Sequence, residues 1–311
     1  MGSQSLTVIG PFMAIMVVGY FIGRLRVLPA ESSGVLSQFV FAVALPALIF
    51  PGVAKTAVGD FFDWTFIGAL GGGMLLVMGA SVLTARRLFP DTLTANGLHG
   101  LAAMFSSTAY IGLPLVLTLF GDEALAPGII GAVITGLVFV PIAIVLAEVG
   151  SNRRTTGALL KPLAITLTRP PLIAAFAGLV VSAAGITIPT PIITFCDVLG
   201  GAFVPCALFA AGLFTAQCTF DGIRLEVGWL VLVKLILHPA ITWMLAVCVF
   251  ELPPLLVAVA VVQAALPTGV PVFVLAQQYG TFVTRSSAII AVSTGLSVVT
   301  LPIWAWLLTS E

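Results

Sequence analysis

Two Gly-x-Pro triplets are the residues of this chain whose types and spacing best suggest chemistry. Gly112-Leu113-Pro114 and Gly269-Val270-Pro271 are 157 positions apart (269 − 112), and each lies in an apolar stretch long enough to cross a bilayer. Proline removes a backbone donor and clashes with the preceding turn, while glycine lets other backbone or a solute approach closely. We therefore expect two helices broken near their middles, which lipid tolerates only where the break is buried or lines a cavity.

Such breaks are suited to binding an anion. Each break leaves N–H groups without acceptors at the start of a half-helix, and that end carries about half a positive charge. Two such ends brought together in the middle of the membrane would form a site for a carboxylate. The residues expected to bind substrate are Ser107, Thr108, Tyr110, Gly112, Leu113, Pro114, Gln263, Thr268, Gly269, Val270 and Pro271. The alternative, that the prolines only kink packed helices, is disfavoured by the matched pair.

Ionisable side chains inside apolar stretches are costly, which makes Lys234, His238 and Asp197 candidates for ion coupling. Lys234 could instead extend back to the cytoplasmic surface. His238, one helical turn deeper, could exchange a proton near neutral pH or could be a neutral, hydrogen-bonded histidine. Asp197 is expected to be buried in a polar contact between helices, and Glu226 to lie in a solvated loop.

The elements that position these residues follow from composition. Hydrophobic residues make up 60% of the chain and charged residues 8%, which excludes a soluble globular protein. The pattern predicts an all-α polytopic membrane protein with ten transmembrane helices, the fourth and ninth of them broken. The ten stretches cover residues 6–23, 33–50, 64–83, 97–120, 127–148, 171–188, 191–215, 227–250, 254–278 and 286–308.

The cations predict an orientation. Ten of the 12 Lys and Arg residues lie in alternate loops, which would all be on one side of the membrane. The other two are Lys55 and Lys234. Because cytoplasmic loops collect cations, both termini are expected outside, which in a bacterial inner membrane is the periplasm. The longest loop, 150–170, would be a cytoplasmic linker between two five-helix units, 1–149 and 171–311.

An odd number of helices per unit makes the second unit an inverted copy of the first, as in many secondary transporters. Residues typical of membrane helices recur at an offset of 159 positions, which supports this 5+5 inverted repeat. The matched residues are Gly19 with Gly178, Pro46 with Pro205, and Thr135-Gly136 with Thr294-Gly295.

Several segments resemble the auxin efflux carrier family, and the PTG-x-x-VF stretch is similar to its bacterial malonate-transporter-type members. These segments are FSSTAYIGLPL at 105–115, KLILHP at 234–239, ALPTGVPVFVLAQQYG at 265–280 and STGLSVVTLP at 293–302. The resemblance implies that helices four and nine cross at their prolines. It also implies a dimerising scaffold of helices one, two, six and seven, with the other six moving as a transport domain. Ser107 and Ala109 stand where the family usually has Asn and Gly.

Together these features predict a secondary transporter of a small organic anion, a malonate-like dicarboxylate or related carboxylate. Transport is expected to proceed by alternating access of the elevator type. The alternatives are a carrier of a hydrophobic aromatic or bile-acid-like monocarboxylate, and an anion channel. An enzyme is not expected, because the apolar stretches lack paired aspartates or a Ser-His pair. No cofactor, metal site or nucleic-acid partner is expected; the expected partners are the lipid bilayer, a second copy in a homodimer, and a proton as coupling ion, with sodium the alternative.

Overall fold

The computed structural model of the chain describes residues 2–55, 63–139, 141, 142, 145, 168–218 and 225–309. Regular structure in these residues is helical, apart from one isolated bridge between Ser106 and Thr268. Five helical runs among them are long and apolar enough to cross a membrane: Ser32–Lys55, Trp64–Leu88, Thr190–Gln217, Leu225–Val249 and Val283–Leu308. The expectation of an all-helical chain with several membrane-spanning helices agrees with this structure.

The helices occur in two groups along the chain. The first group comprises α1 (Gly2–Arg24), α2 (Ser32–Phe39), η1 (Val40–Ala44), α3 (Leu45–Lys55), α4 (Trp64–Leu88), α5 (Leu93–Met104), η3 (Thr108–Gly112), α6 (Leu113–Phe120), η4 (Asp122–Ala124), α7 (Leu125–Ile134) and η5 (Thr135–Phe139). The second comprises α10 (Pro170–Ala183), α11 (Thr190–Gly201), α12 (Phe203–Gln217), α13 (Leu225–Leu232), η6 (Val233–Leu237), α14 (His238–Met244), η7 (Leu245–Val249), α15 (Pro254–Ala265), α16 (Pro271–Tyr279) and α17 (Val283–Thr309). Most of the predicted linker, residues 150–167, and its cations Arg153, Arg154 and Lys161 lie outside the described residues.

The ends of several helices follow from local side chains. Asp63 caps α4 by accepting hydrogen bonds from the backbone N–H groups of Thr65 and Phe66, each at 3.0 Å. Thr92 caps α5, because its hydroxyl accepts from the N–H of Ala95 at 3.2 Å. Gly280 ends α16 with φ of 65°, a left-handed conformation that costs glycine little.

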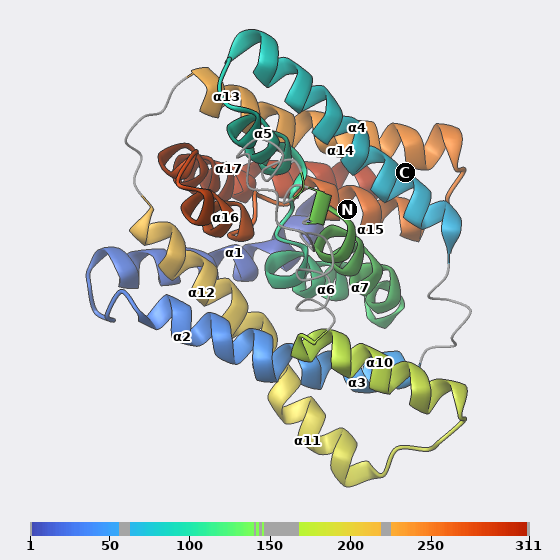
Figure 1. Cartoon of the computed structure of the whole chain (residues 1–311). Helices are drawn as coiled ribbons and strands as arrows, with labels where there is room; N and C mark the ends of the chain where they lie inside the picture. The colour runs from blue at the N-terminus through green and yellow to red at the C-terminus, as the bar shows by residue number, and fades with distance from the viewer. Residues whose placement is uncertain are drawn as a thin grey trace.

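The helices pack in two bodies (Figure 1). In one, α1 packs on α12, α10 and α11 pack on α3, and α2 packs on α12. In the other, α4, α5 and α13–α17 pack on one another, and α6 and α7 lie between the two bodies (Figure 1). The largest buried cluster extends through both bodies.

Two close helix crossings in the first body have matching positions. A Cβ on Gly19 of α1 would collide with the backbone carbonyl of Phe209 in α12. A Cβ on Gly178 of α10 would lie 2.9 Å from the carbonyl oxygen of Phe50 in α3. Gly178 lies 159 positions after Gly19 (178 − 19), and Phe209 lies 159 positions after Phe50 (209 − 50). The two crossings are therefore related by one offset.

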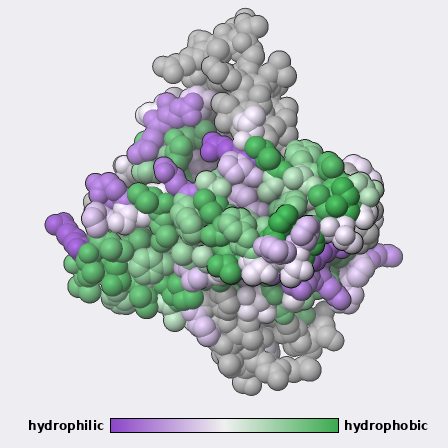
Figure 2. All heavy atoms as spheres, turned by 90° about the horizontal axis from the view of Figure 1, so that it is seen from below, coloured by the Kyte–Doolittle hydropathy of each residue, from purple (hydrophilic) through white to green (hydrophobic). Residues whose placement is uncertain are grey.

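The outer surface of the described residues suits lipid. Large apolar side chains are widely exposed, including Phe21, Leu83, Phe176 and Val299. Figure 2 shows apolar atoms across the middle of this face and hydrophilic atoms mostly toward its margins. A surface of this kind would be unstable in water but is ordinary in a bilayer.

Candidate functional site

The centre of the second body holds two unwound segments that pair with each other. Residues 105–107 separate α5 from η3, and residues 266–270 separate α15 from α16. The N–H of Ser107 donates to the carbonyl of Pro267 at 3.0 Å, and the N–H of Gly269 donates to the carbonyl of Phe105 at 3.1 Å. This antiparallel pairing satisfies polar backbone that would otherwise be costly in a membrane interior.

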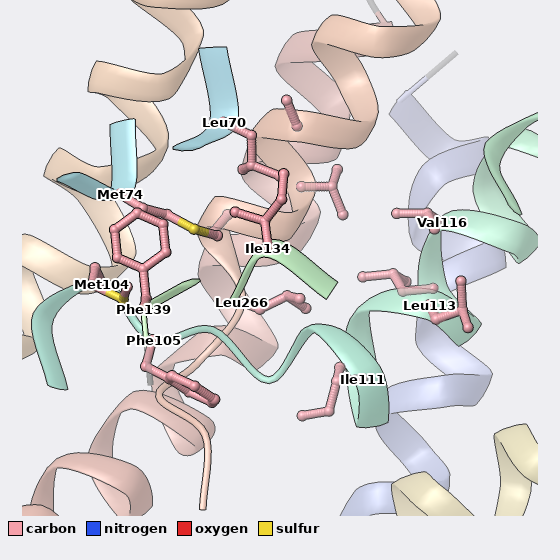
Figure 3. Close-up of a cluster of buried hydrophobic side chains, with 14 of the residues drawn as sticks. Leu70, Met74, Met104, Phe105, Ile111, Leu113, Val116, Ile134, Phe139 and Leu266 are labelled. Carbon is pink, nitrogen blue, oxygen red and sulfur yellow. The ribbon is translucent and has the colours of Figure 1, made fainter. Parts of the chain in front are cut away.

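Side chains pack reciprocally around the paired segments. A Cβ on Gly269 would lie 2.8 Å from the ring of Phe105, and a Cβ on Gly112 would lie 2.5 Å from Cδ1 of Leu266. Each Gly-x-Pro triplet therefore supplies space for an apolar side chain from the other break. Figure 3 shows Phe105, Leu266 and Ile111 beside the unwound segments.

The first break lies at residues 105–107, not at Gly112-Leu113-Pro114 where the sequence pattern predicts it. The helical run from Thr108 to Phe120 includes the triplet, and the N–H of Gly112 donates to the carbonyl of Ser107 at 3.1 Å. Pro114 is tolerated because it lies near the start of α6, after the wider π turn of η3. The N–H groups without a helical acceptor are therefore those of residues 108–110.

The second break lies at the second triplet. Pro271 begins α16, where its missing N–H costs nothing, and Val270 precedes it. The Val270 carbonyl accepts from the N–H of Phe273 at 2.9 Å. Thr268 is buried: its hydroxyl donates to the carbonyl of Ala102 at 3.0 Å, and its N–H donates to the hydroxyl of Ser293 at 3.2 Å.

Lys234 reaches this pairing from η6 and is fully buried, with 0% of its surface exposed. Its Nζ lies 2.7 Å from Oγ of Ser106, 2.6 Å from the carbonyl oxygen of Ala264 and 3.1 Å from Nδ1 of His238. Among the described residues, no carboxylate forms an ion pair with it. Lys234 does not extend to the protein surface, and it links the first break to the end of α15.

His238 is also fully buried, and its Nε2 has no hydrogen-bond partner among the described residues.

The π turn that carries Lys234 has a local cause. Pro239 cannot donate to the carbonyl of Leu235, four residues earlier, and the indole N–H of Trp304 donates to that carbonyl instead, at 3.0 Å.

The other predicted residues occupy varied places. Gln263 is buried and donates to the carbonyl of Gly128 in α7 at 2.9 Å, while its Oε1 has no partner among the described residues. Thr108 is buried and Ser107 is partly buried, both at the first break. The Tyr110 side chain lies outside the described part. Asp197 is exposed on α11, so the expectation that it is buried is wrong.

The sequence patterns missed an ionic cluster at the start of α5, α13 and α17. Glu226 is buried, not solvated: it accepts from Nη1 of Arg285 at 3.0 Å and lies 3.0 Å from Nδ1 of His99. Arg285 also pairs with Asp91, at 2.6 Å. Burial opposes ionisation of Asp91, but hydrogen bonds from Arg285 and the N–H of Thr92 outweigh it and lower the pKa of this carboxyl.

Ser106 is the other residue at the site that the sequence pattern did not single out. Its only signal was its position in the FSSTAYIGLPL segment, immediately before Ser107. Within the described ranges, no three His, Cys, Asp or Glu side chains are grouped as a metal site would require. The described part of the site therefore consists of paired backbone, hydroxyl groups, the Lys234 amino group and the His238 imidazole.

Comparison with known proteins shows that this chain is similar to membrane transport proteins. A family model described as membrane transport protein matches residues 6–159 and 151–305. The chain is 31% identical over 292 residues to "Putative malonate transporter" of Rhizobium meliloti, across 93% of this chain and 91% of that protein. It is 28% identical over 306 residues to an "Uncharacterized transporter" of Methanothermobacter thermautotrophicus, across 94% and 95%. It is 24% identical over 307 residues to "Uncharacterized transporter YfdV" of Escherichia coli K12, across 95% of each.

Proposed function

Because this chain belongs to the auxin efflux carrier family of membrane transport proteins, and is thus a transporter and not an enzyme, we propose that it carries a small organic anion. The carrier would be secondary and would work by alternating access. Its binding site would lie where residues 105–107 and 266–270 pair.

One observation carries this proposal: Lys234 has a fully buried amino group without a carboxylate partner among the described residues. A buried charge is normally paired, so an anionic solute is the natural partner. Ser106 binds the ammonium group and lies two positions before Thr108, where the helix with free N–H groups begins. A carboxylate at the first break would therefore meet both an ammonium group and the positive end of a helix.

The repeat and the mode of transport are part of the same proposal. A 5+5 inverted repeat accounts for the Gly19–Phe209 and Gly178–Phe50 contacts, which share one offset. The division into two helical bodies is what an elevator-type carrier needs, with the body containing α1, α3, α10 and α12 as the static, dimer-forming part. The distribution of cations supports an orientation with both termini outside, which in a bacterial inner membrane is the periplasm.

For the substrate, we favour a malonate-like dicarboxylate or a related small carboxylate. The support is the name of the Rhizobium relative. A hydrophobic aromatic or bile-acid-like monocarboxylate is the second candidate, since Phe105 and Leu266 line the paired segments with apolar surface. A channel is the least favoured alternative, because the polar residues of the sequence cluster at the two breaks instead of lining a continuous path.

Reconstitution tests the proposal. The purified chain in liposomes should take up radiolabelled malonate, pyruvate or indole-3-acetate saturably, and internal unlabelled substrate should accelerate uptake by counterflow. A thermal-shift screen of mono- and dicarboxylates should identify which of them stabilise it. Single-channel currents would indicate a channel, and stabilisation by cations or neutral solutes alone would rule out an anion site.

A further inference from the structure

The geometry points to a proton-coupled charge site formed by Lys234 and His238, which takes up one proton with each monovalent carboxylate so that the carried complex is neutral. This inference rests on the proposed function and specifies both the form of the substrate and its coupling ion. The contacts of the two side chains carry it.

The contacts of Nζ fit two protonation states without moving a heavy atom. As an ammonium group, Lys234 donates its three hydrogens to Ser106 Oγ, the Ala264 carbonyl and His238 Nδ1. As a neutral amine, it donates its two hydrogens to Ser106 and Ala264. Its lone pair then accepts a hydrogen bond from the Nδ1–H group of His238. Every hydrogen bond at Nζ is retained in both states.

The two states differ at Nε2 of His238. When Nδ1 carries the hydrogen of the ring, Nε2 has only a lone pair. When Nδ1 instead accepts from the ammonium group, the ring hydrogen is on Nε2, a buried donor that needs an acceptor. Nε2 is buried and has no partner within the described ranges, so it is available to a ligand.

A carboxylic acid completes the exchange in one balanced step. Its O–H proton passes to the lone pair of Nε2, while the Nδ1 proton passes to Nζ and makes an ammonium ion. The resulting carboxylate accepts a hydrogen bond from Nε2–H. One proton and one negative charge have then entered together, and the buried positive charge is compensated by the substrate.

No other described titratable group disturbs this pair. The elements packed against η6 and α14 are α4, α5, α13, α15 and α17, together with η7. Their charged groups and histidine are Arg86, Arg87, His99, Glu226 and Arg285, and η7 also carries the thiol Cys248. His99 and Arg285 both bond to Glu226, while Arg86 and Arg87 are exposed in the last turn of α4. Within the described ranges, no side chain is therefore left to compensate a positive charge on Lys234 or His238, which leaves that role to the substrate.

A net charge of one at the site sets the form of the substrate. A monocarboxylate would be carried with one proton. A dicarboxylate such as malonate would have to bind as its monoprotonated form, because a second buried negative charge would remain unpaired. Counted from the dianion, malonate would then bring in about two protons and pyruvate about one.

Proton counting in liposomes tests this inference with the wild-type protein. Uptake of radiolabelled pyruvate and malonate is measured beside internal pH, reported by a trapped dye, with valinomycin and potassium setting the membrane potential. We expect about one proton per pyruvate, about two per malonate, and rates that do not change when about 100 mV is imposed. Saturable uptake without proton entry, or uptake driven by the potential, overturns the inference but leaves an anion carrier. The lack of uptake of any carboxylate overturns the proposed function itself.

Two variants assign the protons to these side chains. Lys234→Gln keeps a donor for Ser106 and Ala264 but cannot take up a proton, and His238→Gln cannot relay one. We expect each to lower proton-driven uptake at least tenfold, whereas Lys55→Gln, at an exposed lysine, should behave as wild type. Melting curves identify variants that fail to fold. If both variants fail to fold, the proton count of the wild-type protein tests the inference by itself. Unchanged proton coupling in a folded Lys234→Gln protein would refute the assignment.

Discussion

The reciprocal packing of the two breaks predicts a specific response to Gly269→Ala. The new Cβ would lie 2.8 Å from Cε1 and 2.9 Å from Cδ1 of Phe105, a ring that is 7% exposed. Contacts this short require the ring or the backbone to move. Overpacking of this kind costs about 1–3 kcal/mol, which corresponds to a fall in melting temperature of about 2–5 °C for a chain of 311 residues.

The assay is thermal unfolding of the purified protein in detergent, followed by counterflow in liposomes. Phe105→Leu should restore much of the loss in the Gly269→Ala background, because the shorter side chain vacates the colliding positions. Gly79→Ala is the matched control: no atom lies within 4 Å of its added Cβ, and alanine favours a helix over glycine by about 0.5–1 kcal/mol. If the losses of Gly269→Ala and Phe105→Leu simply add in the double variant, the ring does not pack on this glycine.

Three further substitutions test other contacts. Gly131→Ala would place a methyl group on the amide of Gln263; we expect destabilisation by about 1–3 kcal/mol, relieved by adding Gln263→Ala, and equal melting of the single and double variants would contradict the packing. Trp304→Phe should lower stability by about 1–3 kcal/mol, because the Leu235 carbonyl loses its donor; a Trp304→Phe protein that melts like wild type would show that water or another group replaces the indole. The lowered pKa of Asp91 means that its contribution is present above its unfolded pKa and is lost as pH falls through the folded value. Asp91→Asn should therefore reduce stability by at most about 1 kcal/mol at pH 7, and the difference from wild type should shrink as the pH falls through the folded pKa, whereas a difference that grows on acidification would refute this sign.

The sequence predicted the broken helices better than it predicted where one of them breaks. Pro271 ends a helical pattern and begins a new helix, so the second break falls at its triplet. Pro114 is equally visible in the sequence, but a proline near the start of a helix need not interrupt it, and the chain unwinds earlier, at 105–107. Whether a proline starts a helix or breaks one depends on tertiary partners, here the pairing with residues 266–270.

Partners distant in sequence explain what the patterns missed. Glu226 was expected in solvent because its neighbours in the chain are charged, yet it pairs with Arg285, 59 positions away, and His99, 127 positions away. Lys234 was recognised as unusual from its apolar surroundings, but its bond to Ser106, 128 positions away, depends on the folded structure. The apolar surroundings of Lys234 indicate its burial, but neither its contacts nor the burial of Glu226 can be read from neighbours in the sequence.

The crossing of α1 with α12 has a consequence for biosynthesis. Gly19 packs on Phe209, and 190 residues (209 − 19) separate them in the chain. At a synthesis rate of about 5–20 residues per second, α1 would emerge roughly 10–40 seconds before its partner. During that time, lipid or the insertion machinery must cover the glycine face of α1, because the helix that will occupy it has not yet been made. A truncated nascent chain that ends before α12 should therefore expose this face to crosslinking, and the full-length chain should protect it.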